Sequence, residues 1–316
     1  MSNNYRKGLL FGILGDLFVG FQPIVANARP EILDAYLFAA MTCIVEAAIF
    51  FPIIFIEIKF HKSKVKKENI IAQTEDSVLI NWKKNIKVLI LIGFIFGLNQ
   101  LLFFIGYRLA GAINGSLTQK TTVFFGIIFG YLILKEKVTK LQIIFSTILF
   151  LGLFIAITQL SFDLNNLNIN IILGVLVLLF ITCLWMFGHT ITKPIFNRKE
   201  VTPSQMVFIR NILSGIMLFS TYFIFYPIEN LTLFFDPINL FYFVAMGAVY
   251  ATGLFCWYTT LSYLDVSKAT IIFSPTPIVT AIFATIMLGE IFTIFHLIGI
   301  LIVIFSIIII VRQKES

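Results

Sequence analysis

The sequence predicts an all-α membrane protein whose ten transmembrane helices form two inverted five-helix repeats. Three observations support this fold class. Of the 316 residues, 59% are hydrophobic and 12% are charged, and that charged share is about half of the usual value for a soluble domain. The apolar residues gather into ten runs of about 20 residues, which is the length that crosses a bilayer. Two segments also resemble each other at a constant offset of 154 residues.

The ten runs are expected to be helices, because in lipid every backbone polar group must be satisfied within its own segment. They also lack the alternation that is typical of barrel strands. The first run follows Arg6-Lys7 but is too long for a signal peptide and has no small-residue cleavage site, so we interpret it as a span. The predicted spans are 8–26, 35–58, 86–106, 110–134, 141–159, 170–188, 204–225, 238–260, 266–288 and 294–311.

Basic residues are distributed unevenly between alternate loops. If the N-terminus is inside, nineteen Lys and Arg residues fall on the inner side, whereas only Arg29 and Arg108 fall on the outer side. The outer loops carry these acidic residues instead: Glu31, Asp34, Asp163, Glu229, Asp236 and Glu290. Because cytoplasmic loops carry an excess of Lys and Arg, both termini of this multi-pass protein are expected in the cytoplasm, with the spans in the cell membrane. The hydrophilic stretch 59–87 is expected to be the only long loop, solvated or in contact with anionic lipid headgroups.

Composition and motifs disfavour several other classes of protein. The net charge of +7 lies in a few loops and at the chain ends, so it indicates membrane orientation and no nucleic-acid partner is expected. Cys43, Cys183 and Cys256 lie within apolar runs without metal-ligand spacing, so we expect buried thiols and no metal site. The sequence contains no glycine-rich phosphate loop and no hydrolase signature, so no cofactor and no ATP-driven pumping by this chain alone are expected.

An internal repeat divides the chain. Residues 109–140 and 263–294 align without a gap and place Glu136 opposite Glu290. Each segment has a polar start with small residues, an apolar helix and a Leu-x-Glu exit. The division gives a first five-helix repeat over 1–160 and a second over 161–316. Because five is odd, the second copy is inverted, and inverted repeats place a binding site near the bilayer midplane.

Taken together, these features resemble the EamA-like branch of the drug/metabolite transporter superfamily. The resemblance covers nearly the whole chain and rests on the five-plus-five plan, the Leu-x-Glu exits, residues 174–185, Pro275 and Pro277. It implies ten helices around a central cavity and the export or exchange of small metabolites. The sequence departs from the family pattern at 119–122, where a proline and apolar residues are usual, and at 15–16, where Trp-Gly is common. The identity of the substrate is therefore not carried over.

Four ionisable side chains lie inside the predicted spans: Asp16, Glu46, Lys120 and Arg210. A charge at the bilayer centre costs about 2.5–3.5 kcal/mol on insertion scales, so these groups are expected to face a cavity or one another. The functional interpretation is contact with a solute or a proton; the alternative is ion pairing that fixes helix packing. Lys120, near the midplane, suits a carboxylate or a phosphate group. Arg210 lies about 9 Å from the helix end, so it could instead reach the inner surface.

Neutral polar residues extend the predicted substrate-binding site. Gln119 is adjacent to Lys120, and Asn99 and Gln100 are adjacent on the third span. Neighbouring side chains on a helix point in different directions, so we expect only one of Asn99 and Gln100 to face the cavity. Pro275 and Pro277 free backbone groups in the ninth span, which predicts either a hinge or a packed kink.

Three aromatic residues could stack on a flat substrate, namely Trp185, Trp257 and Tyr258. Aromatic residues near span ends are more often interface anchors, although Trp185 lies too deep for that role. His189 follows the sixth predicted span, so an interfacial position is favoured over a role as a proton relay.

The predicted function is secondary transport of a small metabolite by alternating access between the two halves, by a monomer or homodimer in the lipid bilayer. The mixed charges at the midplane suit a zwitterion such as an amino acid, or an organic anion. One alternative is a membrane-embedded enzyme, which would need paired carboxylates or a histidine cluster at one interface. Another is a non-transporting scaffold, which would tolerate the removal of its midplane charges.

Overall fold

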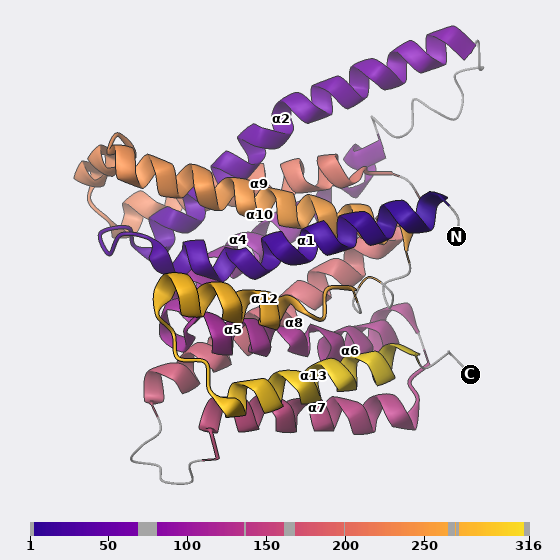
Figure 1. Cartoon of the computed structure of the whole chain (residues 1–316). Helices are drawn as coiled ribbons and strands as arrows, with labels where there is room; N and C mark the ends of the chain where they lie inside the picture. The colour runs from indigo at the N-terminus through magenta and orange to yellow at the C-terminus, as the bar shows by residue number, and fades with distance from the viewer. Residues whose placement is uncertain are drawn as a thin grey trace.

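The computed structural model describes residues 3–68, 81–135, 137–160, 168–198, 200–264, 269 and 272–312. Within these residues the chain forms helices and no strand (Figure 1). Nine helices of the described part are long and apolar enough to cross a membrane, and Thr276–Leu288 forms a tenth, shorter apolar segment. The all-α fold with ten spans is therefore confirmed.

Two of the ten spans are not regular α-helices along their whole length. The fourth is broken by a 3-10 turn, and the ninth ends in a π-helical turn. The spans are, in order, α1 (Asn3–Ala28), α2 (Ala35–Glu68), α4 (Ile86–Ala110), α5 (Ala112–Thr118) with η2 (Gln119–Thr121) and α6 (Thr122–Leu134), α7 (Lys140–Thr158), α8 (Ile169–Asn197), α9 (Pro203–Phe225), α10 (Pro237–Tyr263), α12 (Thr276–Phe283) with η4 (Ala284–Leu288), and α13 (Ile294–Arg312). The 3-10 segments η1 (Asn81–Asn85) and η3 (Ile228–Phe234) lie in the connections.

Local signals set several helix starts. The Thr139 hydroxyl accepts a hydrogen bond from the backbone N–H of Gln142, whose side chain bonds back to Thr139, so a capping box begins α7. Thr202 and Gln205 form the same arrangement at the start of α9.

Two predicted boundaries were wrong. α2 continues to Glu68 and η1 begins at Asn81, so the stretch 59–87 is not one long loop; residues 69–80 lie outside the described part. α8 continues to Asn197, well beyond the predicted end at residue 188.

In the ninth span, α12 begins at Thr276, with Pro275 at its N-cap and Pro277 in its first turn. Ala269 and Ile272 are also helical and the Phe273 N–H donates to the Ala269 oxygen, so helical backbone precedes the prolines within the predicted span. The prolines therefore interrupt the ninth span, and a proline in the first turn of α12 needs no N–H partner.

Helix packing reflects the inverted repeat. α2 packs against α9, α5 against α12 and α7 against α13, so each of these spans meets its counterpart in the other repeat. α1 packs against α10, and α8 packs in the corresponding way against α4. A twofold pseudo-axis in the membrane plane relates these pairs, as expected for inverted repeats. Glu136, one of the two residues that aligned the repeats, lies outside the described residues.

Small residues allow the closest helix crossings. In the α7–α13 pair, a Cβ atom on Gly152 would lie 3.1 Å from the backbone oxygen of Gly299, and a Cβ atom on Gly299 would lie 2.6 Å from that of Gly152. Such backbone approach supplies the van der Waals contact that holds helices together in lipid, where apolar burial gives no drive.

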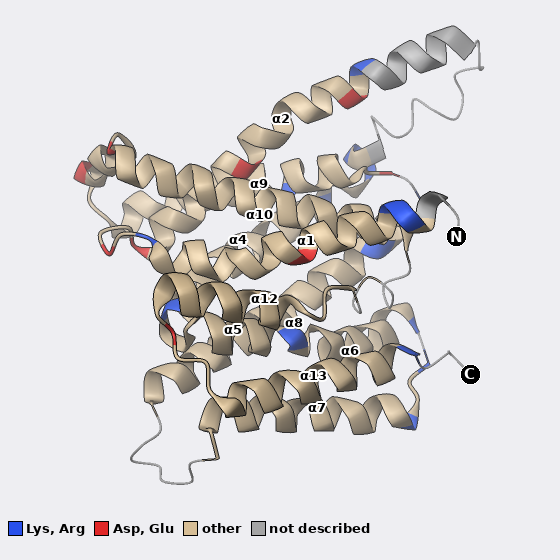
Figure 2. Ribbon diagram, in the orientation of Figure 1, with Lys and Arg blue, Asp and Glu red and all other residues tan. Residues whose placement is uncertain are grey.

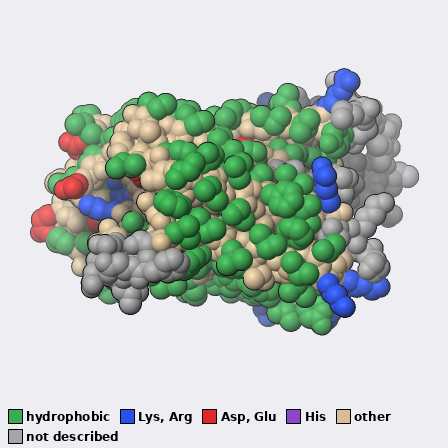
Figure 3. Space-filling view, turned by 60° about the horizontal axis from the view of Figure 1, so that its bottom comes forward, with side chains coloured by type: hydrophobic (Ala, Val, Ile, Leu, Met, Phe, Trp, Pro, Cys, Tyr) green, Lys and Arg blue, Asp and Glu red, His purple; other side chains and the backbone are tan. Residues whose placement is uncertain are grey.

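The two ends of the bundle differ in charge. The described N- and C-terminal ends lie at the same end of the bundle (Figure 1). Lys and Arg gather at that end, whereas acidic residues cluster at the opposite end (Figure 2). A largely hydrophobic surface separates the two, as Figure 3 shows on one face. On α7 and α13 this surface includes the exposed side chains of Leu151, Phe154, Leu301 and Phe305.

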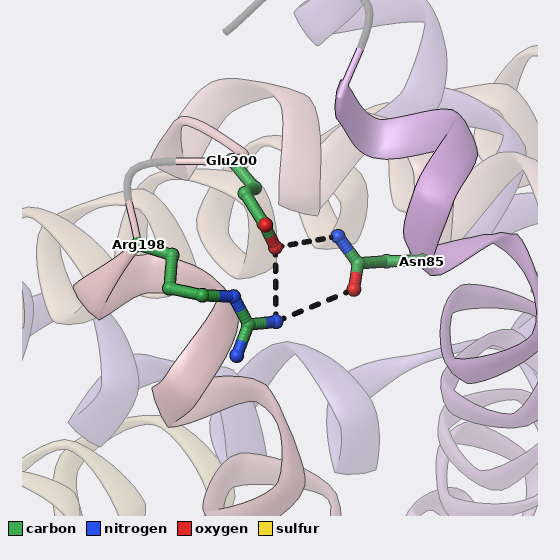
Figure 4. A network of polar contacts seen from close by, with 3 residues as sticks. All are labelled: Asn85, Arg198 and Glu200. Atoms are coloured by element: carbon green, nitrogen blue, oxygen red, sulfur yellow. Dashed lines mark hydrogen bonds and ion pairs between the residues drawn. The ribbon is translucent and has the colours of Figure 1, made fainter. Parts of the chain in front are cut away.

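A polar network at the basic end ties η1 to the α8–α9 connection (Figure 4). Glu200 Oε2 lies 2.9 Å from Arg198 Nη2 and accepts a hydrogen bond of 2.8 Å from Asn85 Nδ2. The Arg198 hydrogen bond lowers the pKa of Glu200 below its ordinary value. The contribution of this network to stability is therefore present above that ordinary value and is lost as the pH falls through the lowered pKa.

Candidate functional site

A cavity of about 150 Å³ lies between the two repeats. This volume is far larger than the ~15 Å³ that one water molecule needs. Residues of α1, α4, η2, α6, α8, α9, α10 and α13 contribute to its wall, together with Phe273 before α12. The lining residues are Val19, Gln22, Phe96, Gln119, Lys120, Thr122, Val123, Trp185, Met186, His189, Arg210, Tyr250, Gly253, Leu254, Trp257, Phe273 and Ile307.

Lys120 lies on η2, where the fourth span is interrupted. Its ammonium donates hydrogen bonds to the backbone oxygen of Phe273 at 2.6 Å and to Thr276 Oγ1 at 2.7 Å, both in the opposite repeat. The Thr276 hydroxyl in turn donates to Asp16 Oδ1 on α1. Lys120 and Asp16, both described, are therefore linked through a hydroxyl and form no direct ion pair. Asp16 is 6% exposed and does not line the cavity.

Arg210 supplies a second cationic group from α9. The side chain is 2% exposed, and its guanidinium carbon lies 4.0 Å from the centre of the Phe96 ring. No described residue accepts a hydrogen bond from Nε of Arg210. The arginine thus faces the cavity, stacked on an aromatic ring, and does not reach the membrane surface.

Glu46 lies behind the cavity wall on α2. It is fully buried, and Oε2 accepts a hydrogen bond of 2.8 Å from Asn211 Nδ2, the residue after Arg210. Oε1 has no hydrogen-bond partner among the described residues. Arg210 lies close enough to interact electrostatically with this carboxylate. Glu46 is thus coupled to a lining residue but does not line the cavity itself.

Aromatic side chains form much of the remaining wall. Trp257 meets Phe273 edge to face with ring centres 5.0 Å apart, and Trp185 lies 6.1 Å from Phe103. Tyr258 does not line the cavity and packs instead between His189 and Phe196.

The predicted amides divide in a similar way. Gln119 lines the cavity, and its Nε2 has no partner among the described residues. Asn99 and Gln100 are both buried within the helix bundle and neither is a lining residue, so the expectation that one of them faces the cavity is not met. The described residues offer no hydrogen bond to either polar atom of the Asn99 amide.

Twelve of the lining residues were not predicted as site residues, among them Gln22, Phe96, His189 and Tyr250. His189 was expected at the interface, but α8 extends eight residues beyond it, which places the imidazole inside the membrane span. Its ring lies 5.3 Å from Phe96 and 6.2 Å from Trp257. The residues after His189 mix apolar side chains with Lys193 and Pro194, so the sequence carried little signal that the helix continues. Gln22 carried the same signal as Asn99 and Gln100, an amide inside a predicted span, whereas nothing in the sequence distinguishes Phe96 or Tyr250 from other residues of their spans.

The charge of the lining is one-sided. Lys120 and Arg210 contribute two cationic groups, and none of the described lining residues carries a carboxylate. Asp16 is linked to the lining residue Lys120 through the Thr276 hydroxyl. Glu46 accepts a hydrogen bond from Asn211, the residue after the lining residue Arg210. The arrangement offers donors to an anion and aromatic surfaces to its apolar part.

Glu290 fixes the segment that leads to Lys120. Its carboxylate accepts hydrogen bonds from the backbone N–H groups of Ala112 at 2.6 Å and Ile113 at 3.0 Å, at the start of α5. The preceding Gly111 has a φ of +79°, a left-handed conformation that glycine adopts readily. The Leu-x-Glu exit of the ninth span therefore anchors the fourth span across the repeat boundary.

Comparison with known proteins agrees with this architecture. A model of the EamA-like transporter family matches residues 6–158 and 169–312. No curated protein matches the chain. Among 27 matching chains of solved structures, one titled "Crystal structure of protein" has a TM-score of 0.60 and 12% sequence identity, over 96% of this chain and 97% of that chain. At this identity the likeness concerns the fold alone.

Proposed function

Because the chain belongs to the EamA-like transporter family, we propose that it is a secondary carrier that moves small organic anions across the cell membrane by alternating access. The observation that carries this proposal is the charge of the cavity wall. Lys120 and Arg210 line it, whereas the carboxylates of Asp16 and Glu46 lie behind it. A wall with two cations and no facing carboxylate favours an anion.

Each cation retains capacity for a ligand. An ammonium has three donors, and Lys120 uses two of them on Phe273 and Thr276. Arg210 presents a planar fork of donors whose orientation is supported by the Phe96 ring. A carboxylate or phosphate group would satisfy these donors in a site shielded from water, where such bonds are strong.

The positions of the two acids support proton coupling over amine binding. A substrate amine would need a carboxylate at the cavity surface, so an organic anion is favoured over a zwitterion. Two cations and two carboxylates leave the empty site neutral, and a bound monoanion adds one negative charge. Uptake of a proton by Asp16 or Glu46 restores neutrality, which lowers the cost of moving a charge through the membrane interior.

The orientation of the carrier in the membrane is part of this proposal. The described N- and C-terminal ends lie at the basic end of the bundle, and the positive-inside rule favours the cytoplasmic side for that end. A monomer contains the whole cavity, so the site needs no residue from a second copy.

Transport by the purified protein in liposomes tests the substrate class. Uptake of labelled benzoate, lactate, succinate and phosphate should be measured beside choline and glucose as cationic and neutral controls. At least one anion should enter faster than into empty liposomes, and Arg210→Gln should reduce that uptake. Arg108→Gln is the matched control, because Arg108 is exposed at the end of α4 and does not line the cavity. Uptake of choline or glucose without uptake of any anion would refute the proposal.

A further inference from the structure

Thr276 lies between Lys120 and Asp16 and has more partners than one hydroxyl hydrogen can serve. Its Oγ1 lies 2.7 Å from Lys120 Nζ, 2.6 Å from the backbone oxygen of Phe273, and within hydrogen-bond distance of Asp16 Oδ1. An ammonium can only donate, so the hydroxyl accepts from Lys120. The single hydroxyl hydrogen must then choose between Asp16 and the Phe273 carbonyl.

The protonation state of Asp16 decides that choice. An ionised carboxylate only accepts, and hydrogen bonds to charged groups are the stronger ones, so the Thr276 hydrogen points to Asp16. In this state the Phe273 oxygen is left to Lys120, at 2.6 Å. The ammonium is then held against the opposite repeat by two acceptors and by the nearby negative charge.

A proton on Asp16 reverses the chain of hydrogen bonds. The acid O–H donates to Thr276 Oγ1, and the hydroxyl hydrogen turns to the Phe273 oxygen. The added proton stays on Asp16, and no other hydrogen is gained or lost. Both acceptors of Lys120 now receive a second donor, and the negative charge that attracted the ammonium is gone. Lys120 is therefore freer to direct its donors into the cavity.

We propose that Thr276 is a positioning residue that couples anion binding at Lys120 to protonation of Asp16, so that proton and anion bind cooperatively. This inference rests on the proposed anion transport. It adds that Asp16, and not Glu46, is the group that takes up the coupled proton, and it names the hydroxyl that transmits the coupling.

Few other titratable groups surround this chain of hydrogen bonds. Lys120 is the charged group that acts on Asp16. α10 contributes the thiol of Cys256, which lies beside Gly15. α5, α12 and η4 contain no ionisable side chain among their residues. α4 contributes Tyr107 next to Asn27, and Asn27 lies eleven residues, or about 16 Å of helix, from Asp16.

Thr280 provides a matched control on the same helix. Its hydroxyl also donates from α12 to α1, to the backbone oxygen of Gly20 at 2.8 Å. It is buried like Thr276 but contacts neither Lys120 nor Asp16. Thr276→Val and Thr280→Val therefore remove comparable bonds, and only the first interrupts the proposed coupling.

The test measures benzoate binding to the purified full-length protein. The dissociation constant of benzoate should be measured from pH 5 to 9 for the wild type, Thr276→Val, Thr276→Ser and Thr280→Val. The carboxylic acid stretch in the infrared spectrum, assigned by its loss in Asp16→Asn, reports protonation of Asp16 over the same range. In the wild type, the dissociation constant should fall about tenfold per pH unit of acidification where Asp16 titrates, because one proton binds with the anion.

Thr276→Val should bind benzoate with less than half of that pH dependence, whereas Thr276→Ser and Thr280→Val should keep it. Asp16→Asn is a second test that leaves Thr276 in place, because its amide donates to the hydroxyl as the protonated acid does. It should bind benzoate at every pH as tightly as the wild type does at low pH.

Two results would overturn the coupling while leaving anion transport in place: wild-type pH dependence in Thr276→Val, or weaker binding by Asp16→Asn than by the wild type at high pH. A different result separates the two proposals. If the wild type transports none of the test anions and does not bind benzoate, anion transport itself fails, and the coupling fails with it.

Discussion

Lys120 differs from the other charged residues within the spans because its direct partners are a carbonyl and a hydroxyl of the opposite repeat. The nearest carboxylate, Asp16, is reached only through Thr276. Lys120 is thus both a candidate anion ligand and a link between the repeats. The two roles make different predictions for stability and for transport.

Lys120→Met should reduce anion uptake by about tenfold or more, because loss of a desolvated charge contact costs about 2–5 kcal/mol. It should also lower the free energy of unfolding by about 1–3 kcal/mol, because buried acceptors lose their donor. Uptake into liposomes and thermal melting measure the two effects. The double variant Asp16→Asn/Lys120→Met should recover the melting temperature but not the uptake. Recovery of uptake would show that Lys120 serves only to compensate Asp16.

Arg210→Lys should retain the positive charge and yet lose about tenfold in anion uptake, because an ammonium has neither the planar fork of donors nor the stacked contact with Phe96. Arg108→Lys is the control and should leave uptake unchanged, since Arg108 is exposed at the end of α4. Equal uptake by the two variants would exclude a specific role for the guanidinium.

At the scale of elements, the broken fourth span positions the cavity's lysine. α5 has seven residues and ends at η2, so the position of Lys120 depends on how the start of α5 is held. Glu290 holds it through two backbone N–H groups that would otherwise be unsatisfied at a helix start. The contact crosses from one repeat to the other at the end of the bundle opposite to the chain termini.

Glu290→Gln should lower the free energy of unfolding by about 0.5–2 kcal/mol, because the amide offers one acceptor oxygen and no charge to the helix start. It should also raise the KM for the transported anion, since α5 carries Lys120. Glu229→Gln, an exposed change in η3 at the same end, is the matched control for thermal melting and KM. Identical melting temperatures for the two variants would contradict the anchoring role.

At the scale of the whole molecule, the inverted repeat places spans of opposite direction face to face. Since α2 meets α9 and α5 meets α12, residues from both repeats meet at the pseudo-axis. The cavity and its two cations lie in this region, which is where alternating access needs a site that either side can reach.

Reporter fusions test this architecture directly. A reporter after Ser316 should be cytoplasmic, and a reporter inserted within residues 160–169 should be external, because an odd number of spans separates them. Enzymatic reporters that are active on only one side of the membrane measure both positions. Signals from the same side would rule out ten spans in two inverted repeats.

The spans were predictable because lipid imposes a local condition on the chain. Every backbone group must be satisfied within its own helix, so long apolar runs such as those of α7 and α13 determine their own structure. Capping residues such as Thr139 and Thr202 are local in the same sense. The boundary errors fell where this local signal is weak, at the polar ends of α2 and α8.

The membership of the cavity wall was only partly predictable. Asp16 and Lys120 both lie near the middle of apolar spans, and the sequence gives no reason to place one at the cavity and the other behind it. The rotation of each helix about its own axis decides this, and that rotation depends on contacts with distant spans, such as Thr276 against Asp16. Tyr258 was predicted to line the cavity and does not, whereas His189 was not predicted to line it and does. The length of α8 brings the His189 imidazole into the cavity.

The sequence by itself thus determined the number of spans, the uneven distribution of basic residues between the loops and the presence of four charges within the membrane. These properties follow from local chemistry and from the partition of each residue between water and lipid. The tertiary structure decided which charges face the cavity, which lie behind it and which hydroxyl joins them. These relations depend on how helices from the two repeats pack, because packing makes neighbours of side chains that are far apart in the chain. Close approach between helices, as at Gly152 and Gly299, fixes the rotation of each helix about its axis.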